Sequence, residues 1–194
     1  MIASDFIETL RDSISGVEYV ERFGGLTKLV NIDNKLIPVS VSVEPVDCSE
    51  VEHYRRLIPE AQYKSMVYFE EVSDAQFRAN YTFTQTLRLV VWLNLPKCGF
   101  AAYTFQVLAP IFHFLKRSNS VEVSQGVFVS GVQDITVITA DGATRLFERY
   151  KYDAETYALT RWPYGLYMAE FGISGNFDPR CLPVSAGGAE IICP

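Results

Sequence analysis

Residues 79–95 read ANYTFTQTLRLVVWLNL and decide the fold. Strands favour the β-branched and aromatic residues that fill this stretch. Its first half alternates aromatic and glutamine residues with threonines, whereas Leu87–Leu95 is apolar except for Arg88 and Asn94. An alternating strand has one face in solvent, and a continuously apolar strand is buried on both faces. We therefore predict one long strand with an exposed end and a buried centre.

Shorter strands are predicted on both sides of this stretch. The clearest hairpin joins 26–32 to 36–44, because Asp33, Asn34 and Lys35 between them suit a tight turn with positive φ angles. Gly24-Gly25 marks a break or bulge ahead of it. Further strands are predicted at 17–23, 63–72, 121–132, 135–139 and 161–171.

A first helix is predicted at 3–15, where isoleucine and leucine recur at helical spacing. Ser4 is the predicted N-cap. Gly16 would end the helix in a left-handed cap.

A second main helix is predicted at 101–116, with an apolar stripe that runs from Phe105 to Leu115, and a short helix at 49–57. Residues 96–99 between strand and helix are expected to be a loop. These elements predict a single α+β domain over 1–175. It has a mainly antiparallel sheet, a long β-hairpin or arm, and two main helices packed on the sheet.

The tail at 176–194 is too rich in proline and glycine to build its own core, and Glu190 is its only charge after Arg180. An apolar segment of this kind needs another surface to lie against. We therefore expect an extended C-terminal arm and a protein that works by assembly.

Composition narrows the classes of partner. The chain has 194 residues and a net charge of −6, from 17 basic and 23 acidic residues. Without a cluster of lysine and arginine, sequence-specific nucleic-acid binding is not expected. No leader and no apolar run long enough for a membrane span is evident, so we expect a soluble protein made in the cytoplasm.

The sequence contains no motif typical of a catalytic, metal-binding or nucleotide-binding site. His53 and His113 lack partners at metal-binding spacing, and the four cysteines show no two-residue pairing. Cys48 lies near His53 in sequence, but no glycine-rich oxyanion segment adjoins it. Nucleotide-binding loops and nucleophile elbows are absent from the sequence. We predict no catalytic residue, no cofactor and no metal, and a protein that is not an enzyme.

The layout resembles that of the tail-completion, tail-terminator and neck-ring proteins of tailed bacteriophages. The resemblance covers 1–175 and rests on the following features: an opening helix that contains Asp-Phe-Ile-Glu-Thr-Leu-Arg at 5–11 and ends at Ser15-Gly16-Val17, the long strand 81–95, the helix 101–116, and Arg161-Trp162-Pro163-Tyr164 before the last strand 166–171. The tail and the overall length depart from that pattern and resemble the arms of short-tailed phages, including the crAss-like group.

The resemblance implies a homo-oligomeric ring around the DNA channel at the head–tail junction. It places the protein in the neck or tail of a virion assembled in the bacterial cytoplasm, with other neck, portal or tail proteins as partners. Expected interface residues are Asp33, Asn34, Lys35, Tyr81, Phe83, Trp162, Tyr164, Phe177 and Arg180. Glu70, Glu71 and Asp74 are candidate acids facing the channel, where negative charge would repel DNA; the alternative is that they are ordinary solvated acids.

Two other hypotheses remain open. The aromatic residues could line a pocket in a module that binds a small molecule or a peptide. The chain could also be an enzyme whose site has no local signature, in which case His53 or Cys48 would be needed for turnover.

Overall fold

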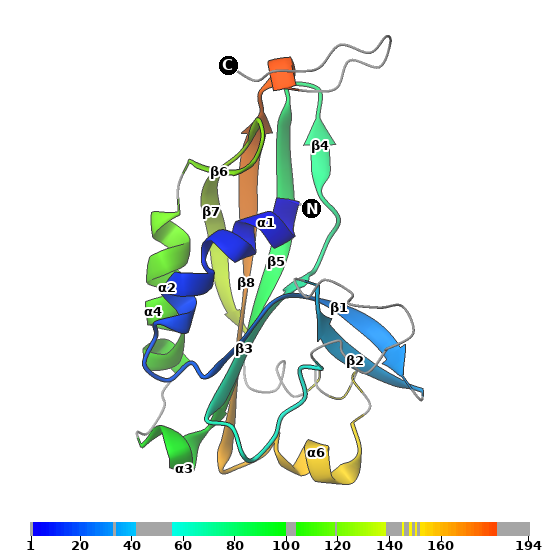
Figure 1. Ribbon diagram of the computed structural model, residues 1–194, viewed down its shortest axis with the longest axis vertical. Coiled ribbons are helices and arrows are strands. Elements are labelled where there is room, and N and C mark those ends of the chain that lie inside the picture. The colour runs from blue at the N-terminus through cyan, green and yellow to red at the C-terminus, as the bar shows by residue number, and fades with distance from the viewer. Residues whose placement is uncertain are drawn as a thin grey trace.

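One mixed sheet runs the length of the molecule (Figure 1). The computed structural model describes residues 2–32, 34–41, 56–99, 104–118, 120–138, 145, 148, 150 and 152–181. The described strands are β1 (Arg22–Ile32), β2 (Lys35–Ser40), β3 (Ser65–Glu71), β4 (Gln76–Arg78), β5 (Thr82–Asn94), β6 (Val121–Ser124), β7 (Val127–Ile138) and β8 (Tyr164–Phe177). The described helices are α1 (Ile2–Thr9), α2 (Arg11–Ser15), α3 (Leu95–Cys98), α4 (Thr104–Arg117) and α6 (Ala154–Ala158), with a 3₁₀ turn η2 at Pro179–Cys181.

The strand order is β2-β1-β3-β5-β8-β7-β6, with β4 paired to β5 beyond the end of β3. All neighbours are antiparallel except β1 and β3, which are parallel. The protein is therefore the predicted α+β domain with a mainly antiparallel sheet.

The central strands are unusually long. β5 has 13 residues and β8 has 14, and they pair from Thr82↔Asn176 to Asn94↔Tyr164. At about 3.3 Å per residue, β5 spans roughly 43 Å. The predicted change along this strand is confirmed, because burial alternates up to Arg88 and is continuous from Leu89 onwards.

Helices α1, α2 and α4 cover one face of the sheet, the front face of Figure 1. Their side chains join one apolar core with the front-facing residues of the central strands. The core includes Phe6, Ile7, Ile14, Leu108, Ile111 and Leu115 from the helices, and Phe83, Leu87, Leu89, Val91, Phe171 and Ile173 from β5 and β8.

A second core lies on the back face, around the lower half of the sheet. Trp92 and Tyr68 are fully buried there with Tyr150. The indole N–H of Trp92 donates to the carbonyl of Leu159 at 2.6 Å, and its ring stacks on Tyr164 at 5.5 Å. This contact fixes the segment around α6 to the sheet.

The predicted hairpin at residues 33–35 is confirmed, since β1 and β2 pair up to Ile32↔Lys35 and Asn34 has a φ of 62°. Gly24-Gly25 is the predicted bulge, because the β1–β3 register shifts there. The strand predicted at 17–23 is wrong in extent, since β1 begins only at Arg22 and the residues before it form turns.

The first helix differs from the prediction. It begins at Ile2, so Ser4 lies within it, and it is interrupted at Leu10. The Leu10 amide donates to Ile7, three residues back, which tightens the chain and turns α2 away from α1. Gly16 ends α2 with a right-handed φ of −77°, so the predicted left-handed cap is wrong.

Three further predictions are corrected. Residues 95–98 form α3 where a loop was expected, because Pro96 suits the first turn of a helix and Gly99, with a φ of 71°, ends it. Phe105 is 76% exposed, since the apolar stripe of α4 passes through Val107 and Leu108 instead. The last strand extends past Phe171 to Phe177, and so includes the first residues of the predicted tail.

Candidate interaction surface

The upper end of the sheet carries exposed aromatic side chains. Phe77 is 64% exposed and Tyr81 is 50% exposed, on the hairpin that joins β4 to β5. The ring of Phe177 lies 5.5 Å from that of Phe77 and 5.5 Å from that of Phe83. We call the exposed pair, with Phe177 beside it, the aromatic tip; it lies at the top of Figure 1.

Backbone contacts hold the aromatic tip in place. The Phe177 amide donates to the carbonyl of Tyr81 at 2.8 Å, and the Asp178 amide donates to the carbonyl of Gly126 at 2.7 Å. Tyr81 has a φ of 60°, a left-handed conformation that is uncommon for a bulky residue. Tyr81 therefore combines a strained backbone with a half-exposed side chain, and strained residues cluster at functional positions.

An exposed ion pair follows the last strand. Arg180 contacts Asp178 at 2.6 Å, and this hydrogen bond lowers the pKa of the carboxyl group to about 2. The pair closes the 3₁₀ turn at Pro179–Cys181, from which the tail leaves the tip.

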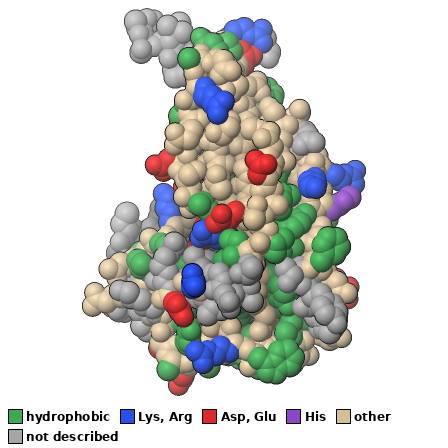
Figure 2. Space-filling view, turned by 180° about the vertical axis from the view of Figure 1, so that it is seen from behind, with side chains coloured by type: hydrophobic (Ala, Val, Ile, Leu, Met, Phe, Trp, Pro, Cys, Tyr) green, Lys and Arg blue, Asp and Glu red, His purple; other side chains and the backbone are tan. Residues whose placement is uncertain are grey.

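The back face of the upper sheet is mainly polar, with few charged side chains (Figure 2). Figure 2 shows few apolar and few charged side chains on this half of the face. The residues are Thr82, Thr84 and Thr86 on β5, Ser174 and Asn176 on β8, and Ser130 and Gln133 on β7. Ser130 and Gln133 hydrogen-bond to Asn176 and Ser174 at 3.1 Å each, and a hollow of about 210 Å³ lies over Gly172.

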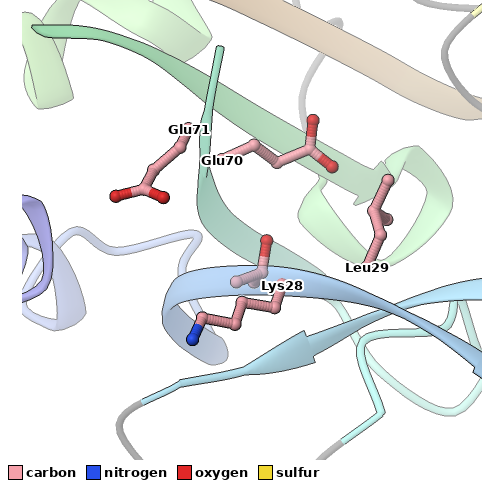
Figure 3. Close-up of a pocket in the computed structure, with 5 residues that line it drawn as sticks. Lys28, Leu29, Glu70 and Glu71 are labelled. Carbon is pink, nitrogen blue, oxygen red and sulfur yellow. The ribbon is translucent and has the colours of Figure 1, made fainter. Parts of the chain in front are cut away.

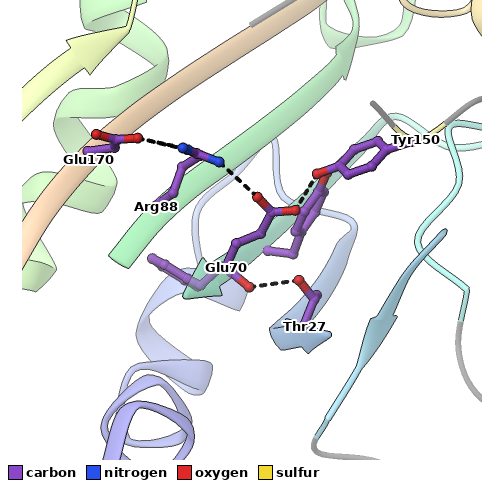
Figure 4. A network of polar contacts seen from close by, with 7 residues as sticks. Thr27, Glu70, Arg88, Tyr150 and Glu170 are labelled. Carbon is purple, nitrogen blue, oxygen red and sulfur yellow. Dashed lines mark hydrogen bonds and ion pairs between the residues drawn. The ribbon is translucent and has the colours of Figure 1, made fainter. Parts of the chain in front are cut away.

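A row of charges crosses the back face below this polar area. Glu70, Arg88 and Glu170 lie on β3, β5 and β8 in direct register (Figure 4). Arg88 contacts Glu70 at 3.2 Å and Glu170 at 2.6 Å. Burial acts to lower the pKa of Arg88, but the hydrogen bond to Glu170 and the charge of Glu70 outweigh it and raise that pKa.

Two tyrosines complete this network. The Tyr150 hydroxyl donates to Glu70 and lies 3.1 Å from the Tyr68 hydroxyl. Burial raises the pKa of both hydroxyls well above the usual value, and the negative charge of Glu70 adds to the effect. Glu70 is only 4% exposed, so the end of the network formed by Glu70 and the two tyrosines is buried.

A hollow of about 340 Å³ opens where β1 diverges from β3 (Figure 3). Its described lining is Thr27, Lys28, Leu29, Glu70 and Glu71. Glu71 points to the opposite face from Glu70 and accepts a hydrogen bond from Gln85 at 3.0 Å. The described lining has no aromatic residue, unlike the pocket that the binding-module hypothesis predicts.

The expected interface residues fall in three separate places. Tyr81, Phe83, Phe177 and Arg180 come together at the aromatic tip, although Phe83 is fully buried and cannot contact a partner directly.

The other expected interface residues lie away from the tip. Trp162 is 84% exposed and Tyr164 stacks on Trp92, both at the other end of β8. Asn34 is exposed in the β1–β2 turn, whereas Asp33 and the side chain of Lys35 lie outside the described residues.

The three candidate channel acids differ in their exposure to solvent. The prediction for Glu70 is wrong, because its carboxylate is buried against Arg88 and Tyr150. Glu71 and Asp74 are exposed. His113 is an exposed residue of α4 near Arg117, while Cys48 and His53 lie outside the described residues. Of the helix predicted at 49–57, residues 49–55 also lie outside them, and the described Arg56 forms a β-bridge with Val39 instead of the end of a helix. Among the described residues, no group of three His, Cys, Asp or Glu side chains could hold a metal ion.

Sequence reasoning missed Phe77 and Arg88. Phe77 stands between Gln76 and Arg78, and a lone aromatic among polar residues was a usable signal for an exposed contact residue. The pairing of Arg88 with two acids depends on strand register across three strands, which has no local signal in the sequence.

Comparison with known proteins returned no match to a family model, to a curated protein or to a solved structure. In the part of the chain that the structure describes, no helix is long and apolar enough to cross a bilayer.

Proposed function

We propose that this protein is a structural subunit that assembles with copies of itself into a ring, in the neck or tail of a tailed bacteriophage. The observation that carries the proposal is the aromatic tip, where Phe77 and Tyr81 stand exposed at the free end of a long sheet. Aromatic residues are enriched at the buried centres of protein interfaces, and clustered exposure of this kind marks contact sites. The resemblance in layout to neck-ring and tail-terminator proteins supplies the class of assembly, with portal, neck or tail proteins as neighbours.

The bulges of β7 favour a contact through the aromatic tip over strand pairing along the edge of the sheet. β7 departs from regular pairing between Val129 and Gly131 and between Gln133 and Thr136, and Asp134 has a φ of 52° there. Bulges of this kind twist an edge and limit uncontrolled strand pairing. A contact through the tip instead joins two different surfaces of neighbouring copies, and such heterologous contacts close into rings when the rotation permits.

The size of the contribution from the tip can be worked out. Phe77 has most of its side chain in solvent, and burying it against a neighbour is worth about 2 kcal/mol. Its loss therefore corresponds to a roughly 30-fold weaker association.

The test is the mass of the purified protein, measured by light scattering after size exclusion over a range of concentrations. The Phe77→Ser oligomer should dissociate at a concentration roughly 30-fold higher than the wild-type oligomer does. Phe105→Ser is the matched control, because Phe105 is as exposed but lies on α4, away from the tip. A wild-type protein that stays monomeric throughout, or equal loss of assembly in both variants, would overturn the proposal.

A further inference from the structure

We propose that residues 182–194 of one copy bind the aromatic tip of the adjacent copy. This inference rests on the proposed ring assembly and names the two surfaces that form its contact. The donor is a segment of this chain, and the acceptor is the exposed edge formed by β4, Phe77 and Tyr81.

The tail sequence divides into a spacer and an apolar hook. Residues 182–188 read LPVSAGG, and proline and glycine here disfavour a helix or a regular strand. Residues 189–193 read AEIIC, the only part of the tail with consecutive β-branched residues. In an extended conformation, Ile191 and Cys193 would face one way and Ile192 the other.

The tail begins at a fixed point on the molecule. The Asp178 amide is bound to Gly126, and Arg180 is paired with Asp178, so the chain is held up to the turn at Pro179–Cys181. The seven residues of the spacer reach at most about 23 Å from this point. Leu182 precedes Pro183 and therefore favours an extended backbone conformation.

The acceptor offers what such a hook requires. β4 is a three-residue strand whose only described strand partner is β5, so its other edge can accept main-chain hydrogen bonds from an added segment. Phe77 and Tyr81 provide apolar area for the isoleucines.

Charge is also complementary. Arg78 is exposed, and within the described part of the chain its guanidinium forms no ion pair. Glu190 is the single charged side chain of the hook. An opposite charge at this position favours one register of the hook over its neighbours.

Disulfide trapping tests this contact. Ala75→Cys places a thiol directly before β4 on the face that carries Phe77, and the natural Cys193 shares a face of the extended hook with Ile191. Cys48→Ser and Cys181→Ser remove two other thiols, and the half-buried Cys98 is kept. The matched control is Gln62→Cys, an exposed position near the opposite end of β5.

Under mild oxidation, Ala75→Cys should give covalent dimers and higher species on non-reducing gels, which disappear with Cys193→Ser. An intramolecular disulfide would show that the tail covers its own tip, and would overturn the inference. Equal cross-linking with Gln62→Cys would do the same.

Light scattering on the same samples separates the two proposals. An oligomer that forms no disulfide between Cys193 and the β4 edge refutes the tail contact and leaves ring assembly standing, whereas a monomer refutes both.

A second experiment measures whether two substitutions affect the same contact. Ile191→Ser alone should weaken assembly roughly tenfold. Combined with Phe77→Ser, it should weaken assembly less than the product of the two separate effects, because both changes remove one contact. Independent, multiplicative effects would contradict the inference.

Discussion

Replacement of Arg88 by methionine should destabilise the fold by about 3 kcal/mol. Arg88 lies between Glu70 and Glu170 in the row across the sheet, at 3.2 and 2.6 Å from their carboxylates (Figure 4). Methionine keeps the apolar stem but leaves the Glu70 carboxylate in a site where its side chain is 5% exposed. Breaking a fully buried ion pair from one side costs about 3–5 kcal/mol. The lower figure applies here because the side chain of Glu170 is 33% exposed and keeps part of its hydration.

Urea unfolding followed by tryptophan fluorescence measures this loss, since Trp92 lies in the adjacent back core. With a slope of about 2–3 kcal/mol per molar urea, the midpoint should fall by about 1–1.5 M. Glu170→Gln is the control and should cost under about 1 kcal/mol, because that carboxylate is partly solvated. The double variant Glu70→Gln with Arg88→Met also removes the buried negative charge of Glu70 and should be more stable than Arg88→Met alone. A midpoint for Arg88→Met within error of wild type, or a double variant less stable than the single one, would refute the reasoning.

Three further outcomes are expected. Gly175→Ala should destabilise by about 3 kcal/mol or more in the same unfolding assay, because a Cβ there would lie 2.0 Å from the backbone oxygen of Phe128; an unchanged midpoint contradicts this. Burial and then the nearby carboxylate raise the pKa of Tyr150, so its contribution to stability is complete below pH 10 and is lost as pH rises towards the folded-state pKa. Tyr150→Phe should therefore lose less unfolding free energy above pH 10 than wild type does. Equal losses of unfolding free energy in the two proteins above pH 10 would exclude this explanation. The Asp178 carboxyl should titrate at about 2 by NMR and move up towards 3.8 in Arg180→Gln, whereas an unshifted titration in that variant would show that Arg180 does not lower the pKa.

Local sequence patterns predicted the elements whose burial or turn conformation follows from consecutive residues. The alternation of threonines with larger residues before Arg88 specified one solvent face, and the apolar run after it specified two buried faces. The hairpin at Asn34 follows in the same way from turn chemistry. The break of the first helix at Leu10 had no such signal, because α2 turns to pack against α4 and the sheet, a tertiary effect.

The candidate interface could be predicted only in part. Tyr81 and Phe177 were among the expected interface residues, but their contact depends on β5 and β8 pairing over their full length. That register also determines that Phe83 faces the core and that Glu70 meets Arg88. A shift of one residue would reverse every one of these side chains, and only the folded sheet determines which arrangement holds.

The unequal covering of the sheet has a consequence for how the molecule opens. Around Leu89–Leu93 both faces of β5 are packed, whereas around Thr82–Thr86 the back face meets solvent. Local unfolding begins where fewest apolar contacts are lost. Amide hydrogens in the upper part of β5 should therefore exchange through partial opening and those in the lower part only through global unfolding. In the proposed assembly, the projecting end of the sheet can rearrange while its base stays folded.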